Sequence, residues 1–164
     1  MPSTSVRLLT PGDWSIFREV RLAALLEAPY AFGSTYGREV EASEESWRAR
    51  LVDRAQFVAE LDGEVVGTAG GVREDDVHAQ LVSMWVAPRA RGKGAGDRLM
   101  NAVDEWAREG GFEALLLWVT EGNPRAEALY MRWGYTRTGA NKPVSHDSSR
   151  MEYQMRRSLR DSPG

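Results

Sequence analysis

The chain has 164 residues, of which 42% are hydrophobic and 27% charged, and its formal net charge is −3. This composition is that of one ordinary soluble domain with a substantial core, and the charge excludes a general attraction to nucleic acid or to anionic membranes. The chain contains no cysteine, which excludes disulfides, a thiol nucleophile and a thiolate metal site. No apolar run is long enough to span a bilayer and no signal peptide is recognisable, so we expect a cytoplasmic protein.

The first half of the chain predicts an alternation of strands and helices. Apolar–polar alternation favours strands, and apolar residues three and four apart favour helices. Asp62-Gly63 is a strong hairpin turn between two apolar runs. The expected elements are a strand at 5–10, a helix that ends near residue 28, an irregular aromatic segment at 30–36, a helix capped by Ser43, and strands at 56–61 and 64–72.

The stretch from Leu81 to Met100 predicts a phosphate site. The apolar end of a strand at 77–86 is stopped by Pro88, and the turn at 89–96 alternates three glycines with three cations before a helix begins at Ala95. Glycines let the backbone approach an anion, and the first N–H groups of a helix have no intrahelical partner. The alternative is a tight basic turn that enters a surface helix. Neither the Walker A spacing nor the dinucleotide fingerprint is present.

The second half predicts a buried strand, a helix and a final pair of strands. Residues 113–119 are almost continuously apolar, as in a central strand covered on both faces. Asn123 can cap the following helix, Pro124 suits its first position, and Gly134 ends it. The last strands are expected at 135–138 and 150–155, with a polar loop at 141–149 that either closes over a site or is a disordered hairpin tip, and with a flexible tail at 159–164.

Two motifs in this order resemble the GCN5-related N-acetyltransferases, the GNAT superfamily. One is Arg89-x-x-Gly92-x-Gly94 after a Val-x-Pro strand end, and the other is Asn123-x-x-Ala126-x-x-Leu129-Tyr130-x-x-x-Gly134-Tyr135. The element order resembles that family over essentially the whole length, whereas periodicity alone predicts only an α/β or α+β domain. The resemblance implies one α/β (α+β) domain over residues 1–164, with a mixed sheet of about seven strands, about four flanking helices, and a splay between strands four and five.

The same resemblance implies acetyl-CoA as co-substrate, with its pantetheine arm between the splayed strands. Tyr130 matches the family tyrosine whose hydroxyl faces the thioester sulfur, so its expected role is the general acid, and the alternative is an amphipathic core residue. The residues expected to bind the cofactor are Met84, Trp85, Val86, Arg91, Gly92, Lys93, Gly94, Ala95, Gly96, Asp97, Asn123, Ala126 and Tyr130.

The general base is left open. Many relatives use a carboxylate or histidine on the fourth strand, where this chain has Gln80, which cannot act as a base. His78 shares a face with Gln80 and carries an imidazole, a common general base, but it also fits an exposed histidine at a strand end. Glu121 is a second candidate and equally fits a helix-entry carboxylate, and Glu60 is a third.

The expected reaction is transfer of the acetyl group to a primary amine of a small molecule, peptide or protein by direct attack in a ternary complex. The backbone amide near Val86 would polarise the thioester carbonyl. Aromatic residues of the first helical region, Tyr30, Phe32 and Tyr36, are candidates for the acceptor wall, although core packing also fits them. A coenzyme-A-binding sensor without catalysis is the main rival, and a nucleotide-phosphate-binding protein is a second. We expect no metal, no nucleic-acid partner and no membrane, and a homodimer is possible.

Overall fold

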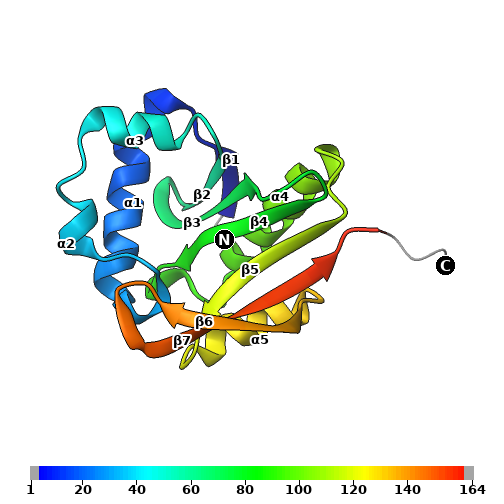
Figure 1. Ribbon diagram of the computed structural model, residues 1–164. Coiled ribbons are helices and arrows are strands. Elements are labelled where there is room, and N and C mark those ends of the chain that lie inside the picture. The colour runs from blue at the N-terminus through cyan, green and yellow to red at the C-terminus, as the bar shows by residue number, and fades with distance from the viewer. Residues whose placement is uncertain (1–3, 161–164) are drawn as a thin grey trace.

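A seven-stranded mixed sheet runs through the computed structural model, which describes residues 4–160 (Figure 1). The strand order is β1-β2-β3-β4-β5-β7-β6, and every neighbouring pair is antiparallel except β4 with β5. This confirms the expected mixed sheet. The strands are β1 (Thr4–Leu8), β2 (Ala55–Leu61), β3 (Glu64–Arg73), β4 (His78–Val86), β5 (Ala114–Thr120), β6 (Thr136–Val144) and β7 (Asp147–Ser158).

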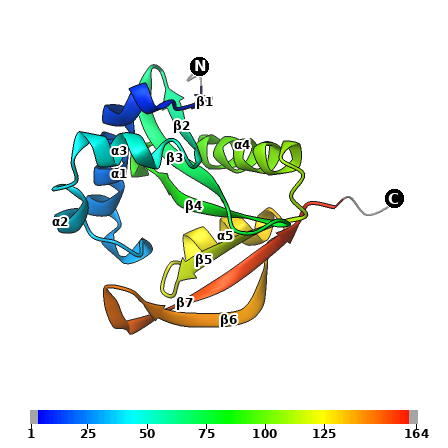
Figure 2. The ribbon, with the colours of Figure 1, turned by 45° about the horizontal axis from the view of Figure 1, so that its top comes forward.

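Helices cover both faces of this sheet. Helix α1 packs against β3 and β4, and α4 packs against β2 and β3 from the opposite side, as Figure 2 shows. Between α1 and α3 lies α2, a helix of four residues in a segment where no helix was predicted. The helices are α1 (Trp14–Glu27), α2 (Tyr36–Glu39), α3 (Glu44–Arg50), α4 (Ala95–Glu109) and α5 (Pro124–Arg132), with 3₁₀ turns at 11–13, 29–31 and 88–90.

Helix α4 shows how sequence pattern becomes packing. Leu99, Val103 and Ala107 recur at helical spacing, and each has at most 1% of its surface exposed. Burial of a side chain such as Leu99 stabilises the fold by about 2 kcal/mol. The β2–β3 hairpin likewise follows from its turn, because Asp62 and Gly63 both have positive φ angles, which a type I′ turn requires.

The C-terminal hairpin is longer than the sequence analysis predicts. Instead of a polar loop at 141–149, β6 continues to Val144 and β7 begins at Asp147, so only Ser145 and His146 form the turn. The first eight residues of β6 are exposed, which explains why they lack the apolar alternation of a half-buried strand.

The C-terminal end of the described chain is anchored. Leu159, which the sequence analysis assigns to a flexible tail, is 5% exposed, and its N–H donates to the Glu113 carbonyl at 2.8 Å. Arg108 donates to the Leu159 carbonyl. Residues 161–164 of the expected tail lie outside the described residues. Among residues 4–160, no helix is both long and apolar enough to cross a bilayer.

Candidate functional site

Strands β4 and β5 separate part-way along their lengths. Their parallel pairing covers three residue pairs, from His78–Ala114 to Gln80–Leu116. Figure 2 shows the two ribbons diverging beyond this point. A bulge in β4 begins the divergence: Ser83 has a φ of +56°, and the register with β3 shifts there. The predicted splay is confirmed.

The backbone of β4 presents polar groups to the gap. The N–H of Ala87 donates to the Val66 carbonyl at 2.7 Å and therefore points toward β3. Because successive residues of a strand alternate in direction, the N–H and C=O of Val86 face the side from which β5 has departed. There the Val86 carbonyl accepts a hydrogen bond from Nε of Arg91 at 3.1 Å. The N–H of Val86 is thus directed at the space between the strands.

The glycine turn leads from β4 into α4. Gly92 and Gly94 have φ angles of +78° and +87°, in the left-handed region that glycine adopts without strain. Gly94 is the N-cap of α4, and its carbonyl accepts from the N–H of Arg98. The N–H groups of residues 95–97 therefore precede the first hydrogen bond of the helix and lie at its positive end. A Cβ at Gly92 or Gly94 would meet no atom within 4 Å, so the space beside the turn is open.

A cleft of about 690 Å³ joins the splayed strands to this turn and to α5. Its size falls in the range of roughly 300–1,000 Å³ that is typical of small-molecule sites. Most of the residues predicted to bind a cofactor line it, together with one predicted acceptor-wall residue. These are Tyr30, Met84, Trp85, Val86, Arg91, Gly92, Gly94, Gly96, Asp97, Asn123, Ala126 and Tyr130.

Four of the residues predicted to bind the cofactor or to form the acceptor wall do not line the cleft. Lys93 is exposed at the tip of the turn, and Ala95 is buried beneath the start of α4. Phe32 is buried in the core, whereas Tyr36 is partly exposed at the first position of α2. Of the expected acceptor wall, only Tyr30 therefore borders the cleft.

Helix α5 carries Tyr130 to the cleft. Its N-cap, Asn123, accepts from the N–H of Ala126 at 3.4 Å through Oδ1, and Pro124 occupies the first helical position, as predicted. The Tyr130 side chain is 7% exposed, and its ring centroid lies 5.9 Å from that of Tyr135. Burial, and then the nearby Tyr153, raise the pKa of Tyr130, so its hydroxyl remains a neutral donor.

The two tentative bases do not reach the cleft. His78 lies at the opposite end of β4 from Val86, and its Nδ1 contacts the carboxylate of Asp75 at 2.9 Å. Glu121 turns toward β7, where its Oε1 accepts from the N–H of Met151 at 3.1 Å. Neither residue lines the cleft. Glu60 forms an ion pair with Arg7 at 2.6 Å. The structure brings none of the three to Tyr130.

Glu27, the last residue of α1, is a site residue that sequence reasoning missed. Its carboxylate accepts from Nε1 of Trp85 at 2.9 Å and pairs with Nη2 of Arg91 at 3.2 Å. It therefore connects α1 to the end of β4 and to the glycine turn. The partners lie 58 and 64 residues away in sequence, so no local pattern reports them.

Asp97 lies in the first turn of α4 but is turned toward α5. Its Oδ1 accepts from Nη2 of Arg132 at 2.7 Å and from Nε1 of Trp133 at 2.8 Å. These bonds, with that of Arg132 the larger effect, lower the pKa of Asp97. The carboxylate is thereby neutralised next to the open N–H groups, and α4 is tied to α5 on the wall of the cleft.

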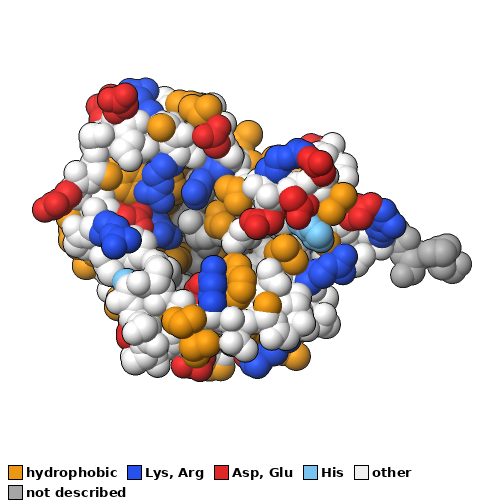
Figure 3. All heavy atoms as spheres, viewed as in Figure 1, with side chains coloured by type: hydrophobic (Ala, Val, Ile, Leu, Met, Phe, Trp, Pro, Cys, Tyr) orange, Lys and Arg blue, Asp and Glu red, His pale blue; other side chains and the backbone are white. Residues whose placement is uncertain are grey.

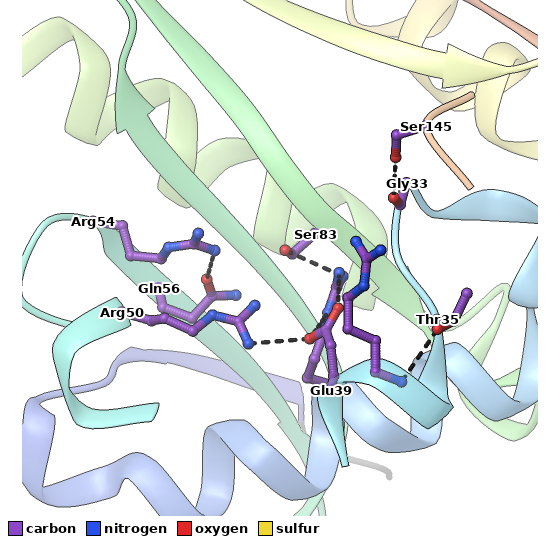
Figure 4. Close-up of polar contacts among 10 residues, drawn as sticks. Gly33, Thr35, Glu39, Arg50, Arg54, Gln56, Ser83 and Ser145 are labelled. Atoms are coloured by element: carbon purple, nitrogen blue, oxygen red, sulfur yellow. Dashed lines mark hydrogen bonds and ion pairs between the residues drawn. The ribbon is translucent and has the colours of Figure 1, made fainter. Parts of the chain in front are cut away.

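A second polar centre lies on the side of the sheet that carries α1–α3 (Figure 4). Glu39, 7% exposed, accepts from Nε and Nη2 of Arg21 at 3.0 and 2.9 Å and from Nη1 of Arg50 at 3.0 Å. Burial alone would raise the pKa of Glu39, but the bonds and charges of these two arginines lower it to about 2. Arg54 completes what we call the arginine cluster: Arg21, Glu39, Arg50 and Arg54. No sequence motif indicated it.

The tip of the C-terminal hairpin closes one edge of this region. The hydroxyl of Ser145 donates to the Gly33 carbonyl at 2.7 Å, so the β6–β7 turn touches the segment between α1 and α2 (Figure 4). The predicted polar loop thus becomes a strand end fixed to the first helical region. Within residues 4–160, no three His, Asp or Glu side chains are grouped so that they could hold a metal ion.

Comparison with known proteins places this arrangement among acetyltransferases. A family model described as the acetyltransferase (GNAT) family matches residues 20–135. An uncharacterized N-acetyltransferase from the hisH–hisA intergenic region of Azospirillum brasilense is 38% identical over 111 residues, 63% of this chain and 66% of that protein. The uncharacterized N-acetyltransferase YhfO of Bacillus subtilis is 31% identical over 59% of this chain and 70% of its own length. The matches thus fall short of the full length of these relatives.

Solved structures share the fold. The yncA protein of Salmonella typhimurium, described as a putative acetyltransferase with its cofactor acetyl-CoA, has a TM-score of 0.77 at 20% identity, over 99% of this chain and 97% of that one. Ard1 from Thermoplasma volcanium has a TM-score of 0.77 at 21% identity, over 96% and 99% of the two chains. At these identities the likeness concerns the fold alone.

Proposed function

Because this chain belongs to the acetyltransferase (GNAT) family, we propose that it transfers the acetyl group of acetyl-CoA to a primary amine in a ternary complex. The amine belongs to a small molecule, a peptide or a protein. One observation carries the proposal: a single cleft runs from the open N–H groups of α4, past the unpaired edge of β4, to the hydroxyl-bearing side chain of Tyr130. The proposal includes one domain over residues 1–164 and a cytoplasmic location, since its co-substrate is an intracellular metabolite.

The residues present fit acetyl-CoA. The pyrophosphate requires converging N–H groups with no side chain in the way, which Gly92, Gly94 and the first turn of α4 supply. Gly96 lies where a Cβ would come within 3.8 Å of Met84 and Val86, so its absence keeps the floor of the cleft open. The polar edge of β4 at Met84 and Val86 suits the amides of a pantetheine arm, which would lie there as an added strand does.

The proposed chemistry uses two groups of the chain, the N–H of Val86 and the hydroxyl of Tyr130. Acetyl-CoA supplies an activated acyl group as a thioester. The N–H of Val86, directed into the gap, is the proposed donor to the thioester oxygen as charge develops on it. The neutral hydroxyl of Tyr130 is the proposed donor to the departing sulfur, a role for which its raised pKa keeps it protonated. The amine attacks directly, because the chain has no cysteine and no serine–base pair is apparent among the described residues.

One observation favours the rival, a coenzyme-A-binding sensor. Among the described residues that line the cleft there is no histidine, and the carboxylate that does line it, Asp97, is held by Arg132 and Trp133. A general base is therefore not built into this wall. The amine must then arrive neutral or lose its proton to water, and the sensor remains the alternative if no amine is acetylated.

Calorimetric titration of acetyl-CoA tests the proposal. The wild type should bind one equivalent, and Gly94→Glu should abolish binding by placing a bulky anion at the phosphate turn. Gly111→Glu is the matched control, because Gly111 also has a positive φ, of +78°, and open surroundings, but lies beyond the far end of α4. No binding by the wild type would overturn the cofactor assignment. Binding without thiol release across a broad panel of amines would favour the sensor.

A further inference from the structure

The arginine cluster carries more positive charge than its own carboxylate balances. Two guanidinium groups contact Glu39 and that of Arg54 lies within reach of its charge, so the cluster has two positive charges in excess within a chain of net charge −3. Glu39 pairs with Arg21 and Arg50. Arg54 is half-buried, and no carboxylate of the described chain lies within ion-pair distance of it; its hydrogen-bond partner is Oε1 of Gln56 at 3.3 Å.

Aromatic rings partly shield these cations from water. The guanidinium of Arg50 lies 4.4 Å from the ring centroid of Trp47, and that of Arg54 lies 5.9 Å from that of Phe17. Burial lowers the pKa of Arg50, and burial with the neighbouring charges lowers that of Arg54 to about 10. An excess of half-buried charge without a counterion is unfavourable by itself, and it is typical of a place where an anionic ligand supplies the missing charge.

None of the four residues of the arginine cluster lines the cleft, but Arg21 contacts two residues that neighbour cleft residues in sequence. Nη1 of Arg21 lies 3.4 Å from Oγ of Ser83, the residue that immediately precedes Met84 in the cleft wall. The guanidinium of Arg21 also stacks on Phe32, two residues beyond Tyr30, which lines the same cleft. Arg21 therefore connects the arginine cluster to the β4 bulge and to the segment after α1.

The molecular surface and the close-up view both show the positive charge of the arginine cluster. Figure 3 shows a hollow beside β4 with several Lys and Arg side chains gathered around it. In Figure 4 the side chains of Arg50 and Arg54 extend side by side toward Glu39 and Ser83. Beneath them Gln56 donates to Thr68 at 2.6 Å, and a Cβ at Gly70 would come within 2.5 Å of Oε1 of Gln56. This glycine leaves room for the amide on which Arg54 rests.

Resting on the acetyltransferase function proposed above, we propose that the acceptor carries an anionic group, a carboxylate or a phosphate, as well as its amine. Arg54 and Arg50 bind the anion, and the amine is thereby directed past Ser83 toward the splayed strands. Guanidinium groups suit this role because they stay charged and bind planar oxyanions with two hydrogen bonds. Arg21, held by Glu39, positions the anionic group of the acceptor and the β4 bulge.

The first test measures anion binding without any turnover. The protein alone is titrated with succinate and with inorganic phosphate and followed by nuclear magnetic resonance. At least one of these two anions should cause saturable chemical-shift changes at Arg54, Ser83 and Glu39. Arg54→Gln should weaken this binding about tenfold or more, because it removes a charged donor and leaves Glu39 paired. Arg48→Gln is the matched control: Arg48 lies on the same helix, α3, exposed and paired with Glu44.

The second test compares matched acceptors: one amine scaffold that carries a carboxylate, a phosphate or a neutral amide. The wild type should have a higher kcat/KM for an anionic member, and Arg54→Gln should remove that preference by raising KM, with the acetyl-CoA affinity unchanged. Arg54→Lys, which keeps the charge and loses the planar fork, should restore part of it. The preferred member distinguishes carboxylate from phosphate.

The failures are distinguishable. If acetyl-CoA does not bind the wild type, the proposed function fails, whereas the anion titration still decides whether the cluster is an anion site. If neither anion binds, or if Arg54→Gln and Arg48→Gln behave alike, this inference is overturned while the acetyltransferase proposal stands. Equal kcat/KM for the neutral and anionic acceptors would overturn it as well.

Discussion

The indole N–H of Trp85, at the end of β4, donates to the carboxylate of Glu27, at the end of α1, at 2.9 Å. The same carboxylate holds Arg91 at the entrance of the glycine turn. A negative charge thus lies beside the place proposed for a pyrophosphate, and it is there to position a cation and an aromatic residue. Its removal has two opposite effects, which can be measured separately.

Glu27→Gln should lower the unfolding free energy by about 1 kcal/mol, because the partly exposed ion pair is lost while one hydrogen bond to Trp85 is retained. It should also tighten acetyl-CoA binding roughly two- to fivefold at low salt, since it removes repulsion and leaves Arg91 held by the Val86 carbonyl. Denaturant unfolding and calorimetry check the two parts. Weaker binding at low salt would show that Glu27 acts mainly by orienting Arg91.

Tyr130→Phe should lower kcat about 100-fold with little change in acetyl-CoA affinity, because it removes only the proposed proton donor for the departing sulfur. Tyr135→Phe is the matched control: Tyr135 is equally buried and neighbours Tyr130, but does not line the cleft. Steady-state kinetics on both variants check this. Equal losses in the two variants would point to packing of the aromatic pair rather than acid catalysis.

The pH dependence of kcat/KM should be set by the acceptor amine and by Tyr130. An amine must be neutral to attack, and no base lines the described cleft, so kcat/KM should rise with pH toward the pKa of the acceptor amine. The pKa of Tyr130 is raised above the usual phenol value of about 10, so kcat/KM should not decline below about pH 10 through loss of the tyrosine proton. A profile measured with two amines of different pKa checks this; an ascending limb independent of the amine would indicate an enzyme base.

His78→Gln should leave kcat/KM within roughly twofold of the wild type, since surface substitutions away from a site have small effects. The residue lies at the paired end of β4, bonded to Asp75, and outside the cleft. Kinetics at two pH values check the prediction. A large loss that is greatest at the higher pH, where a general base is unprotonated, would restore the base role considered from the sequence.

Glu39 should make stability depend on acid pH. Its pKa falls from 4.5 in the unfolded chain to about 2 in the fold, so it contributes stability that is fully present above pH 4.5 and is lost as pH falls toward 2. This shift corresponds to about 3 kcal/mol. Glu39→Gln should lower the unfolding free energy by about that amount at pH 7 and by far less near pH 2.

Denaturant unfolding at both pH values measures this difference. Glu44→Gln is the control, because Glu44 forms an exposed ion pair with Arg48 on α3 and should change stability by less than about 1 kcal/mol at either pH. A loss at Glu39→Gln that does not depend on pH would mean that shape rather than charge makes the difference.

Local chemistry predicted much of this protein. The turn at Asp62-Gly63, the glycine turn into α4, the cap at Asn123 and the continuously apolar β5 each depend on residues close in sequence, and all are found. The extent of β6 was not predictable in this way. Its exposed residues have no apolar alternation, and it pairs with β7 at the edge of the sheet, where Pro143 is tolerated.

The site residues differ in the same way, according to how far apart in sequence the contacting residues are. Residues of the glycine turn and of α5 could be proposed from the sequence because each motif consists of residues close together in the chain. Glu27 and the arginine cluster were missed because their contacts join residues far apart, such as Glu27 with Trp85 and Arg21 with Glu39. His78 was considered because strand alternation reports which face a residue occupies. Alternation does not indicate at which residue β5 separates from β4, and His78 lies in the part where the two strands are still paired.

The brief pairing of β4 with β5 has a mechanical consequence. Within residues 4–160, backbone hydrogen bonding between β4 and β5, which joins the β1–β4 half of the sheet to the β5–β7 half, is confined to one end. It comprises the three residue pairs of the parallel ladder and the adjoining bond from the N–H of Glu113 to the Val77 carbonyl. A molecule seated in the gap by backbone hydrogen bonds would serve as the missing rungs of a ladder. Binding of the co-substrate would then also make the junction between the two halves more rigid. Slower amide hydrogen exchange at Met84 and Val86 would report both changes.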